Sequence, residues 1–207
     1  MARAKRSAET TDAMRRELIA AARAMIARDG IHGLTARGLA QELGWAVGTI
    51  YTVAPSLDVI TLEANAAELD ALRGALEAAL DQAAPDPTAQ VLALARGYLA
   101  FAESRPRNWS AIFERQAESG DGPPDWYQAR QLALFDLLER TLRPLAGSAT
   151  EARWAARSFW AALQGFLALS MAGHVERVAE DPETGRRQDL AAYLVEMLLS
   201  GLAARRG

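Results

Sequence analysis

The sequence predicts an all-α protein, in which a small N-terminal domain of three helices precedes a larger helical domain. Alanine, leucine, glutamate and arginine, which favour helices, are abundant. Apolar residues recur every three or four positions, and the strict alternation typical of strands is almost missing. Short stretches rich in glycine, proline and serine separate these periodic segments. We therefore expect helices throughout and no strand.

The composition suits an intracellular protein that folds without covalent cross-links. With 207 residues and 50% hydrophobic side chains, the chain can bury a sizeable core. It contains no cysteine, which excludes disulfides and thiolate metal ligands. The N-terminus lacks the apolar stretch of a signal peptide, and the longest apolar run, residues 159–173, is shorter than the ~20 residues that cross a bilayer. We expect a cytoplasmic protein with no membrane partner.

The first helix is predicted over residues 11–29, because Met14, Leu18 and Met25 fall on one stripe and Gly30 can end the helix. The residues before it include three cations, Arg3, Lys5 and Arg6. We expect them on a flexible arm, where they either add salt-dependent contacts to a polyanion or form a solvated tail.

Two short helices and one long helix follow. Thr35 is suited to cap a helix over residues 36–43 that ends at Gly44, and a second short helix over residues 46–53 stops before a proline. Ser56 is suited to cap a long helix over residues 57–80, which the proline-rich stretch 83–87 ends. These elements place the domain boundary between residues 1–55 and residues 56–207.

The remaining chain is predicted to form five helices separated by turn-rich segments. Their expected ranges are 88–103, 107–117, 125–145, 149–176 and 188–205.

The two short helices carry the pattern of a helix-turn-helix motif. Such a motif needs a small residue where its helices cross, a residue that tolerates positive φ in the turn, and apolar residues that hold the pair together. Ala40, Gly44 and Ile50 meet these requirements in order. Three apolar neighbours complete the contact: Leu39, Leu43 and Trp45. A short helical hairpin without DNA-binding function can show the same pattern.

Residues 18–62 resemble the N-terminal domain of the TetR family without gaps. The matching features are Gly30, the start of the second helix at residues 35–37, and residues 44–56, in which Gly48-Thr49-Ile50-Tyr51 is the most distinctive part. The resemblance implies a three-helix DNA-binding domain, followed by a divergent helical domain that dimerises and binds a small ligand.

The resemblance also implies which residues contact DNA, chiefly its backbone: Thr35, Arg37, Gly48, Thr49 and Tyr51. Hydroxyl and guanidinium groups are suitable donors to phosphate, and a glycine permits close approach. Thr49 and Thr52 are the candidate hydrogen-bonding base readers, while Ala46 and Val47 can contact thymine methyl groups.

The charge distribution fits contact with DNA at one end of the chain. Residues 1–54 hold eight Lys/Arg against five Asp/Glu, whereas residues 55–207 hold fifteen against twenty-one. A chance asymmetry of a few charges is the alternative. The recognition helix and the residues after it depart from the family pattern. Val47 stands where a polar residue is usual, Val53 and Ala54 stand where aromatic residues are usual, and Leu57 replaces a common lysine. Specificity then depends on apolar contact and DNA shape, or tight DNA binding has been lost.

The second domain holds most of the aromatic residues and Gly165, a small residue in an alanine-rich segment. We expect an apolar effector pocket there, although an ordinary core uses the same residue types. The candidate ligand-binding residues are Phe101, Trp109, Phe113, Trp126, Phe135, Trp160 and Gln164. The last two helices are expected to form the dimer interface. Its candidate residues are Trp154, Gly165, Tyr193, Leu194 and Met197.

No arrangement of residues indicates catalysis, a metal or a cofactor. The two histidines are far apart, and neither a nucleophile elbow nor a phosphate-binding loop is present. The sequence therefore predicts a homodimeric transcriptional regulator, a repressor, that binds a palindromic double-stranded DNA operator and is released by a small apolar or amphipathic effector. The alternative is a helical ligand-binding or interaction protein of the same fold that has lost tight DNA binding.

Overall fold

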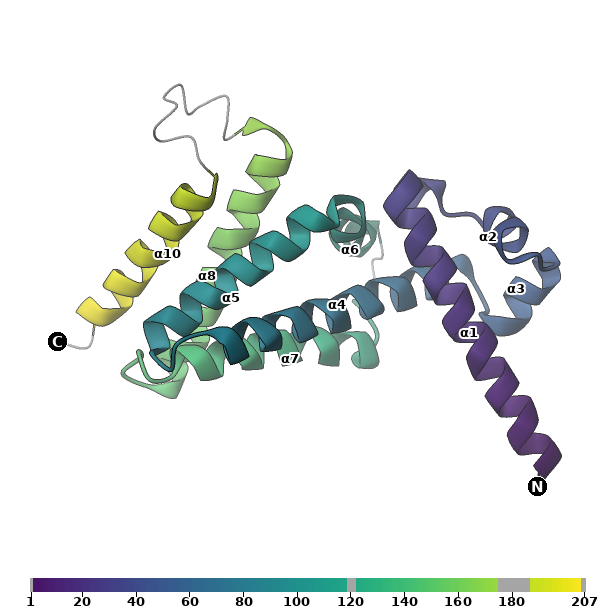
Figure 1. The fold of residues 1–207 in the computed structure, drawn as a ribbon, viewed down its shortest axis with the longest axis horizontal. Coiled ribbons are helices and arrows are strands. Elements are labelled where there is room, and N and C mark those ends of the chain that lie inside the picture. Colours follow the sequence, from purple (N-terminus) through teal and green to yellow (C-terminus); the bar gives the residue numbers. More distant parts are fainter. Residues whose placement is uncertain (1, 119–121, 175–186, 206–207) are drawn as a thin grey trace. The chain divides into compact units, whose positions relative to one another are not determined.

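The computed structural model describes residues 2–118, 122–174 and 187–205, and the regular elements in these ranges are helices without any strand (Figure 1). The all-α prediction is confirmed. The chain divides into two compact units. The first contains Met1–Asp70 and Arg105–Tyr127, and the second contains Ala71–Ser104 and Gln128–Gly207.

The first unit begins with α1 (Ala2–Asp29), a 3₁₀ turn η1 (Ile31–Gly33), α2 (Ala36–Leu43) and α3 (Val47–Val53). The predicted caps are present. The Thr35 hydroxyl oxygen accepts a hydrogen bond from the Gly38 amide at 3.0 Å. Gly30 and Gly44 end their helices with φ values of 76° and 68°, which favour glycine because a side chain at positive φ is strained.

Helix α1 is longer than the sequence analysis predicts, since it begins at Ala2 and not near residue 11. The segment that carries Arg3, Lys5 and Arg6 is helical, so its assignment to a flexible arm is wrong. No glycine or proline precedes Gly30, and therefore nothing in this segment interrupts the backbone hydrogen bonds of a helix.

The three helices share a buried apolar core that explains their arrangement. Leu18 and Ile26 of α1, Leu39 of α2 and Ile50 of α3 are almost completely inaccessible to solvent. Each such side chain contributes about 1.5–3 kcal/mol of burial free energy. Ala40 is buried as well, so that α2 and α3 can approach closely.

Helix α4 (Leu57–Gln82) belongs to both units, because its residues up to Asp70 lie in the first and those from Ala71 in the second. Its predicted cap is confirmed, since the Ser56 hydroxyl oxygen accepts from the Val59 amide at 3.2 Å. The first unit also contains α6 (Pro106–Glu118) and the start of α7 (Asp125–Leu142).

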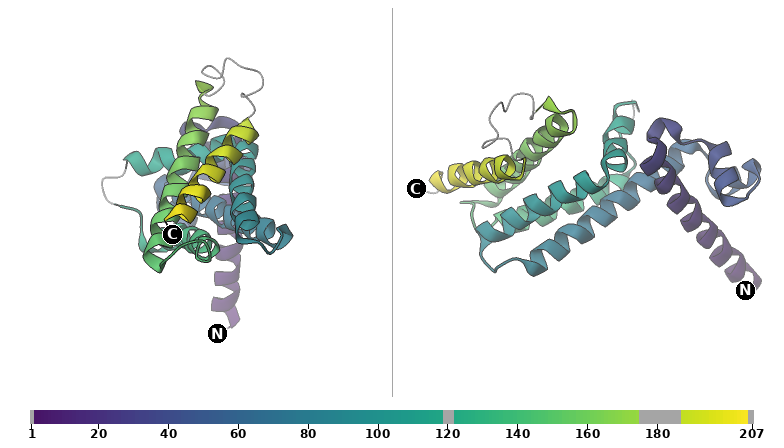
Figure 2. Two further views of the ribbon diagram at one scale, coloured as in Figure 1. Left: turned by 90° about the vertical axis from the view of Figure 1, so that its left-hand side faces the viewer. Right: turned by 45° about the horizontal axis from the view of Figure 1, so that its top comes forward.

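The second unit contains α5 (Pro87–Ser104), most of α7, α8 (Ala149–Met171) and α10 (Arg187–Ala204). Helix α10 packs against both α5 and α8, and it runs alongside α8 in Figures 1 and 2. Two helices end earlier than predicted. Helix α7 stops at Leu142 because residues before Pro144 disfavour the helical conformation. Helix α8 stops at Met171 because Gly173 takes a φ of 67°.

No helix in the described ranges is both long and apolar enough to cross a membrane.

Candidate DNA-binding surface and ligand groove

The turn between α2 and α3 holds the second helix against the first. The Trp45 amide donates to the Ala40 carbonyl at 2.8 Å, directly after the left-handed Gly44. Ile50 and Val53 bury the inner face of α3 in the core. Its outer face is accessible to solvent: 41% of Val47 and 49% of Tyr51 are exposed. The pair therefore has the form of a helix-turn-helix whose second helix can enter a DNA groove.

The predicted DNA-contacting residues lie on or next to this outer surface. Seven of them are exposed: Thr35, Arg37, Ala46, Val47, Gly48, Tyr51 and Thr52. Thr49 is half-buried. Arg37 forms no ion pair with any part of the chain that the structure describes, so its guanidinium is available for a phosphate.

An ion pair that the sequence analysis missed fixes the end of α3. The Arg15 guanidinium of α1 donates through Nε to Glu63 of α4 at 2.8 Å and through a second nitrogen to the other carboxylate oxygen. Its remaining nitrogen lies 3.4 Å from the carbonyl oxygen of Val53, the last residue of α3. Glu63 raises the pKa of Arg15, mainly through this hydrogen bonding. The partners are too far apart in sequence for local spacing to reveal them.

A second missed cluster joins α1, α4 and α6. The buried Glu68 carboxylate accepts from Arg23 at 2.8 Å and from the Asn108 amide at 3.0 Å. The same Asn108 amide nitrogen donates to the Arg23 carbonyl at 3.2 Å, and Asn65 donates to the Ala111 carbonyl at 3.0 Å. These contacts fix α6 against the helices that support the helix-turn-helix, because a buried carboxylate requires its donors.

The predicted ligand-binding residues are divided between the two units. Trp109, Phe113 and Trp126 belong to the first, where the rings of Trp109 and Phe113 are 5.4 Å apart. Phe101, Phe135, Trp160 and Gln164 belong to the second.

Within the second unit, the Phe135 and Trp160 rings make an edge contact at 5.4 Å. The Tyr98 hydroxyl donates to the Gln164 side-chain oxygen at 2.8 Å. Burial raises the pKa of Tyr98, and the hydrogen bond with Trp160 acts in the opposite direction. That the predicted ligand-binding residues surround a common ligand stays a prediction.

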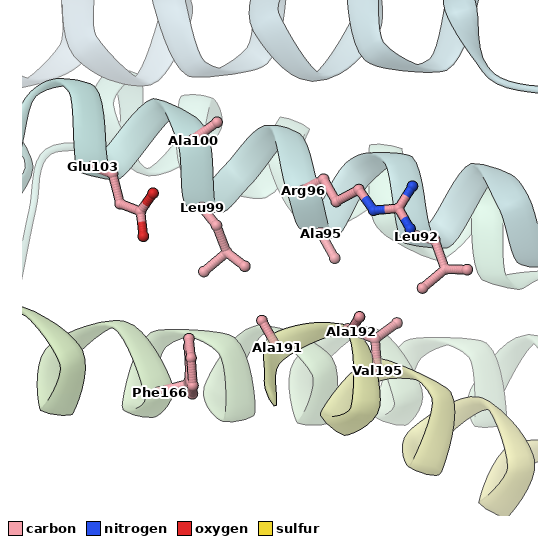
Figure 3. Close-up of a pocket in the computed structure, with 10 residues that line it drawn as sticks. All are labelled: Leu92, Ala95, Arg96, Leu99, Ala100, Glu103, Phe166, Ala191, Ala192 and Val195. Carbon is pink, nitrogen blue, oxygen red and sulfur yellow. The ribbon is translucent and has the colours of Figure 1, made fainter. Parts of the chain in front are cut away.

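The second unit contains a groove that is lined by residues other than these predicted ones (Figure 3). It lies between α5, α8 and α10 and has a volume of about 200 Å³. The figure shows Glu103 towards one end of the α5 wall and Arg96 towards the other, with apolar side chains between and opposite them. The lining residues are Leu92, Ala95, Arg96, Leu99, Ala100, Glu103, Phe166, Ala191, Ala192 and Val195. None of the seven candidate ligand-binding residues is among them, but Phe166, one of the aromatic residues of the second domain from which an apolar pocket was expected, is.

The predicted dimer-interface residues lie on α8 and α10. Large apolar side chains are exposed there, with Trp154 at 68%, Tyr193 at 63% and Met197 at 58%. Leu194 is half-buried. Gly165 is exposed, and a Cβ added to it would meet no described atom within 4 Å. Whether a second copy covers this face stays a prediction.

The buried core that α1, α2 and α3 share and the exposed outer face of α3 define a helix-turn-helix DNA-binding protein. Comparison with known proteins identifies its family. The family model described as "Bacterial regulatory proteins, tetR family" matches residues 18–56, and the model described as "Tetracyclin repressor-like, C-terminal domain" matches residues 91–198. The chain belongs to the TetR family of transcriptional regulators. The family consists of DNA-binding regulators and not of enzymes, as predicted.

The chain is also similar to individual proteins, one by sequence and two by fold. An uncharacterised HTH-type transcriptional regulator of Mycobacterium tuberculosis is 28% identical over 81% of this chain and 74% of its own length. A protein of unknown function from Rhodococcus sp. RHA1 has the same fold, with 23% identity, a TM-score of 0.75, and coverage of 91% of this chain and 95% of its own. A TetR regulator from Streptomyces coelicolor gives 18% identity, a TM-score of 0.68, and coverage of 91% and 96%.

Proposed function

We propose that this protein is a cytoplasmic, ligand-responsive repressor that binds a palindromic DNA operator as a homodimer. The observation that carries the proposal is α3, whose inner face is fixed by Ile50 and Val53 while its outer face remains exposed. Two such helices in a dimer contact successive major grooves about 34 to 36 Å apart. Arg37 and the hydroxyl groups beside α3 supply phosphate contacts.

Dimerisation is supported by the apolar surface of α8 and α10. Trp154, Tyr193 and Met197 are far more exposed than aromatic and long apolar residues usually are. Gly165 of α8 and Gly201 of α10 have open space above them, which allows close approach of another helix. A self-complementary contact of these two helices gives the two-fold symmetry that a palindromic operator requires.

Effector binding is supported by the groove between α5, α8 and α10. Its volume of about 200 Å³ suits a ligand smaller than a typical drug. An apolar floor with a cation and an anion on its wall favours an amphipathic molecule. Binding there acts on operator affinity only if it differs between two states of the protein. Helix α4 is a continuous element through which the second unit can act on the first, because it contributes residues to both.

Two amphipathic probes, hexanoate and hexylamine, test the groove by thermal melting of the purified protein. We expect at least one to raise the melting temperature of the wild type and to lose this effect in Ala192→Phe, which fills the groove. Ala203→Phe, an exposed position on the same helix, is the matched control. A probe effect that survives in Ala192→Phe places the ligand elsewhere.

The test of DNA binding starts with duplexes selected from a random pool by the purified full-length chain. A selected duplex should be retained with an affinity that falls steeply with salt concentration. Arg37→Ala should weaken binding and reduce the salt slope by about one, since one phosphate contact is lost. Arg205→Ala, which changes an exposed arginine of the second unit, should leave both unchanged. Failure to select any duplex over random sequence would favour a ligand-binding protein that has lost DNA binding.

A further inference from the structure

The surface that α3 presents to DNA lacks the side chains that usually read bases. Arginine, lysine, asparagine, glutamine and the carboxylates recognise guanine, adenine or cytosine through hydrogen bonds in the major groove. Helix α3 and its cap Ala46 contain none of these residue types. The exposed residues are Ala46, Val47, Gly48, Tyr51 and Thr52.

The hydroxyl groups on this surface are restricted. The Thr52 hydroxyl donates to the Gly48 carbonyl at 3.0 Å, so its proton is used within the helix and its oxygen is left as an acceptor. Thr49 is half-buried. Tyr51 has one hydroxyl group, which cannot make the paired contact that distinguishes a purine.

Apolar groups remain at the N-terminal end of α3. Ala46 and Val47 are adjacent and exposed, and Val47 lies one helical turn from Tyr51 on the same face. Ala46 and Val47 both expose methyl groups to water in the DNA-free protein. The C5-methyl group of a pyrimidine is the apolar group that the major groove offers, and burying two apolar surfaces against each other is favourable.

We propose that Ala46 and Val47 recognise a C5-methylated pyrimidine in each half of the operator. The inference rests on the proposed DNA binding and specifies what the recognition helix reads. Thymine and 5-methylcytosine carry the same group at the same position. Phosphate contacts from residues such as Arg37 supply affinity, while the methyl contact supplies selectivity.

The experiment compares a duplex selected by the full-length protein with copies in which deoxyuridine replaces single thymidines of a half-site. Uracil pairs like thymine and lacks only the methyl group. At one position of the half-site, replacing thymidine should lower the affinity of the protein for the duplex about fourfold, which corresponds to about 0.8 kcal/mol for one methyl group. Deoxyuridine outside the protected region is the control. A further duplex carries 5-methylcytosine in place of cytosine, and tighter binding there identifies that base as the source of the methyl group.

Val47→Ala links the effect to the side chain. The variant should lose affinity for the thymidine duplex and show a smaller further loss with deoxyuridine, because the contact is already reduced. Its melting temperature should match the wild type, since the side chain is exposed. The inference is overturned if a selected duplex binds tightly but neither replacement changes affinity, or if the thymidine effect is unaltered in Val47→Ala. Failure to select a duplex refutes the proposed DNA binding instead.

Discussion

Arg15 of α1 and Glu63 of α4 form a two-pronged ion pair, and the same guanidinium reaches the carbonyl of the last residue of α3. One side chain therefore joins the three helices where the recognition helix ends. This contact connects the stability of the first unit with the orientation of the surface proposed to bind DNA.

Arg15→Met should lower the free energy of unfolding by about 1 kcal/mol, because a partly exposed charge-assisted pair and a helix-end contact are lost. It should also weaken operator binding, since α3 is less firmly held. Chemical denaturation and binding titrations measure the two effects. Arg16→Met, at the exposed neighbouring position, should change stability by less than about 0.5 kcal/mol. Equal effects of the two variants would remove any special role of Arg15.

Gly48→Ala separates stability from DNA binding. Gly48 is exposed in the first turn of α3, and an added Cβ meets no described atom within 4 Å. Alanine should therefore stabilise the fold by about 0.5 kcal/mol, because glycine is a poor helix former. It should weaken operator binding if the DNA backbone lies against this glycine. Gly74→Ala of α4 is equally unobstructed and should stabilise without affecting DNA binding. Undiminished binding by Gly48→Ala would contradict the close approach.

Tyr193→Glu should dissociate the proposed dimer. Burying an unpaired carboxylate at the proposed α8 and α10 interface costs about 2 kcal/mol or more, which is over tenfold in the dissociation constant. Sedimentation over a range of protein concentrations measures the change. Leu132→Glu, at an α7 position that is 49% exposed, introduces the same charge outside this face and should leave the dimer intact. A dimer equally stable in both variants would place the interface elsewhere.

The buried Tyr98 should make stability fall at alkaline pH. Burial raises the pKa of its hydroxyl above the ordinary value of about 10. Above this ordinary value the unfolded chain releases the phenol proton while the folded chain keeps it, so the free energy of unfolding decreases as pH rises. The loss is absent below about pH 9 and approaches about 1.4 kcal/mol per pH unit above pH 10.

Tyr98→Phe removes the hydroxyl group and with it this loss of stability at alkaline pH. At neutral pH the variant should be less stable by about 1 kcal/mol, because the Gln164 oxygen loses its donor. Between about pH 9 and pH 11 the difference between the two proteins should shrink. Denaturant titrations at several pH values test this, and parallel pH curves for wild type and variant would contradict it.

The sequence predicted the local structure well where short-range chemistry controls it. The caps Thr35 and Ser56 and the end signals Gly30 and Gly44 depend on a few neighbouring residues, and the structure confirms all four. The predicted start of α1 and the predicted end of α8 were wrong. The first lacked a distinct start signal, and at the second the prediction overlooked Gly173.

The candidate sites were predictable to different degrees. The exposed face of α3 followed from the helical period and the apolar residues that must be buried. Arg15 with Glu63, and Arg23 with Glu68 and Asn108, could not be predicted, because each joins helices that are distant in sequence. The groove was missed for a similar reason: alanine and leucine on three helices carry no local sign of a shared opening.

By itself, the sequence determined that the chain is helical, where the two helices of the DNA-binding motif begin and end, and which side of each helix is apolar. These properties come from backbone preferences and side-chain periodicity within one or two turns. Only the tertiary structure decided which helices share the buried ion pairs and which enclose the groove. Such contacts depend on the packing of whole helices against one another, and many different pairings satisfy the same apolar stripes.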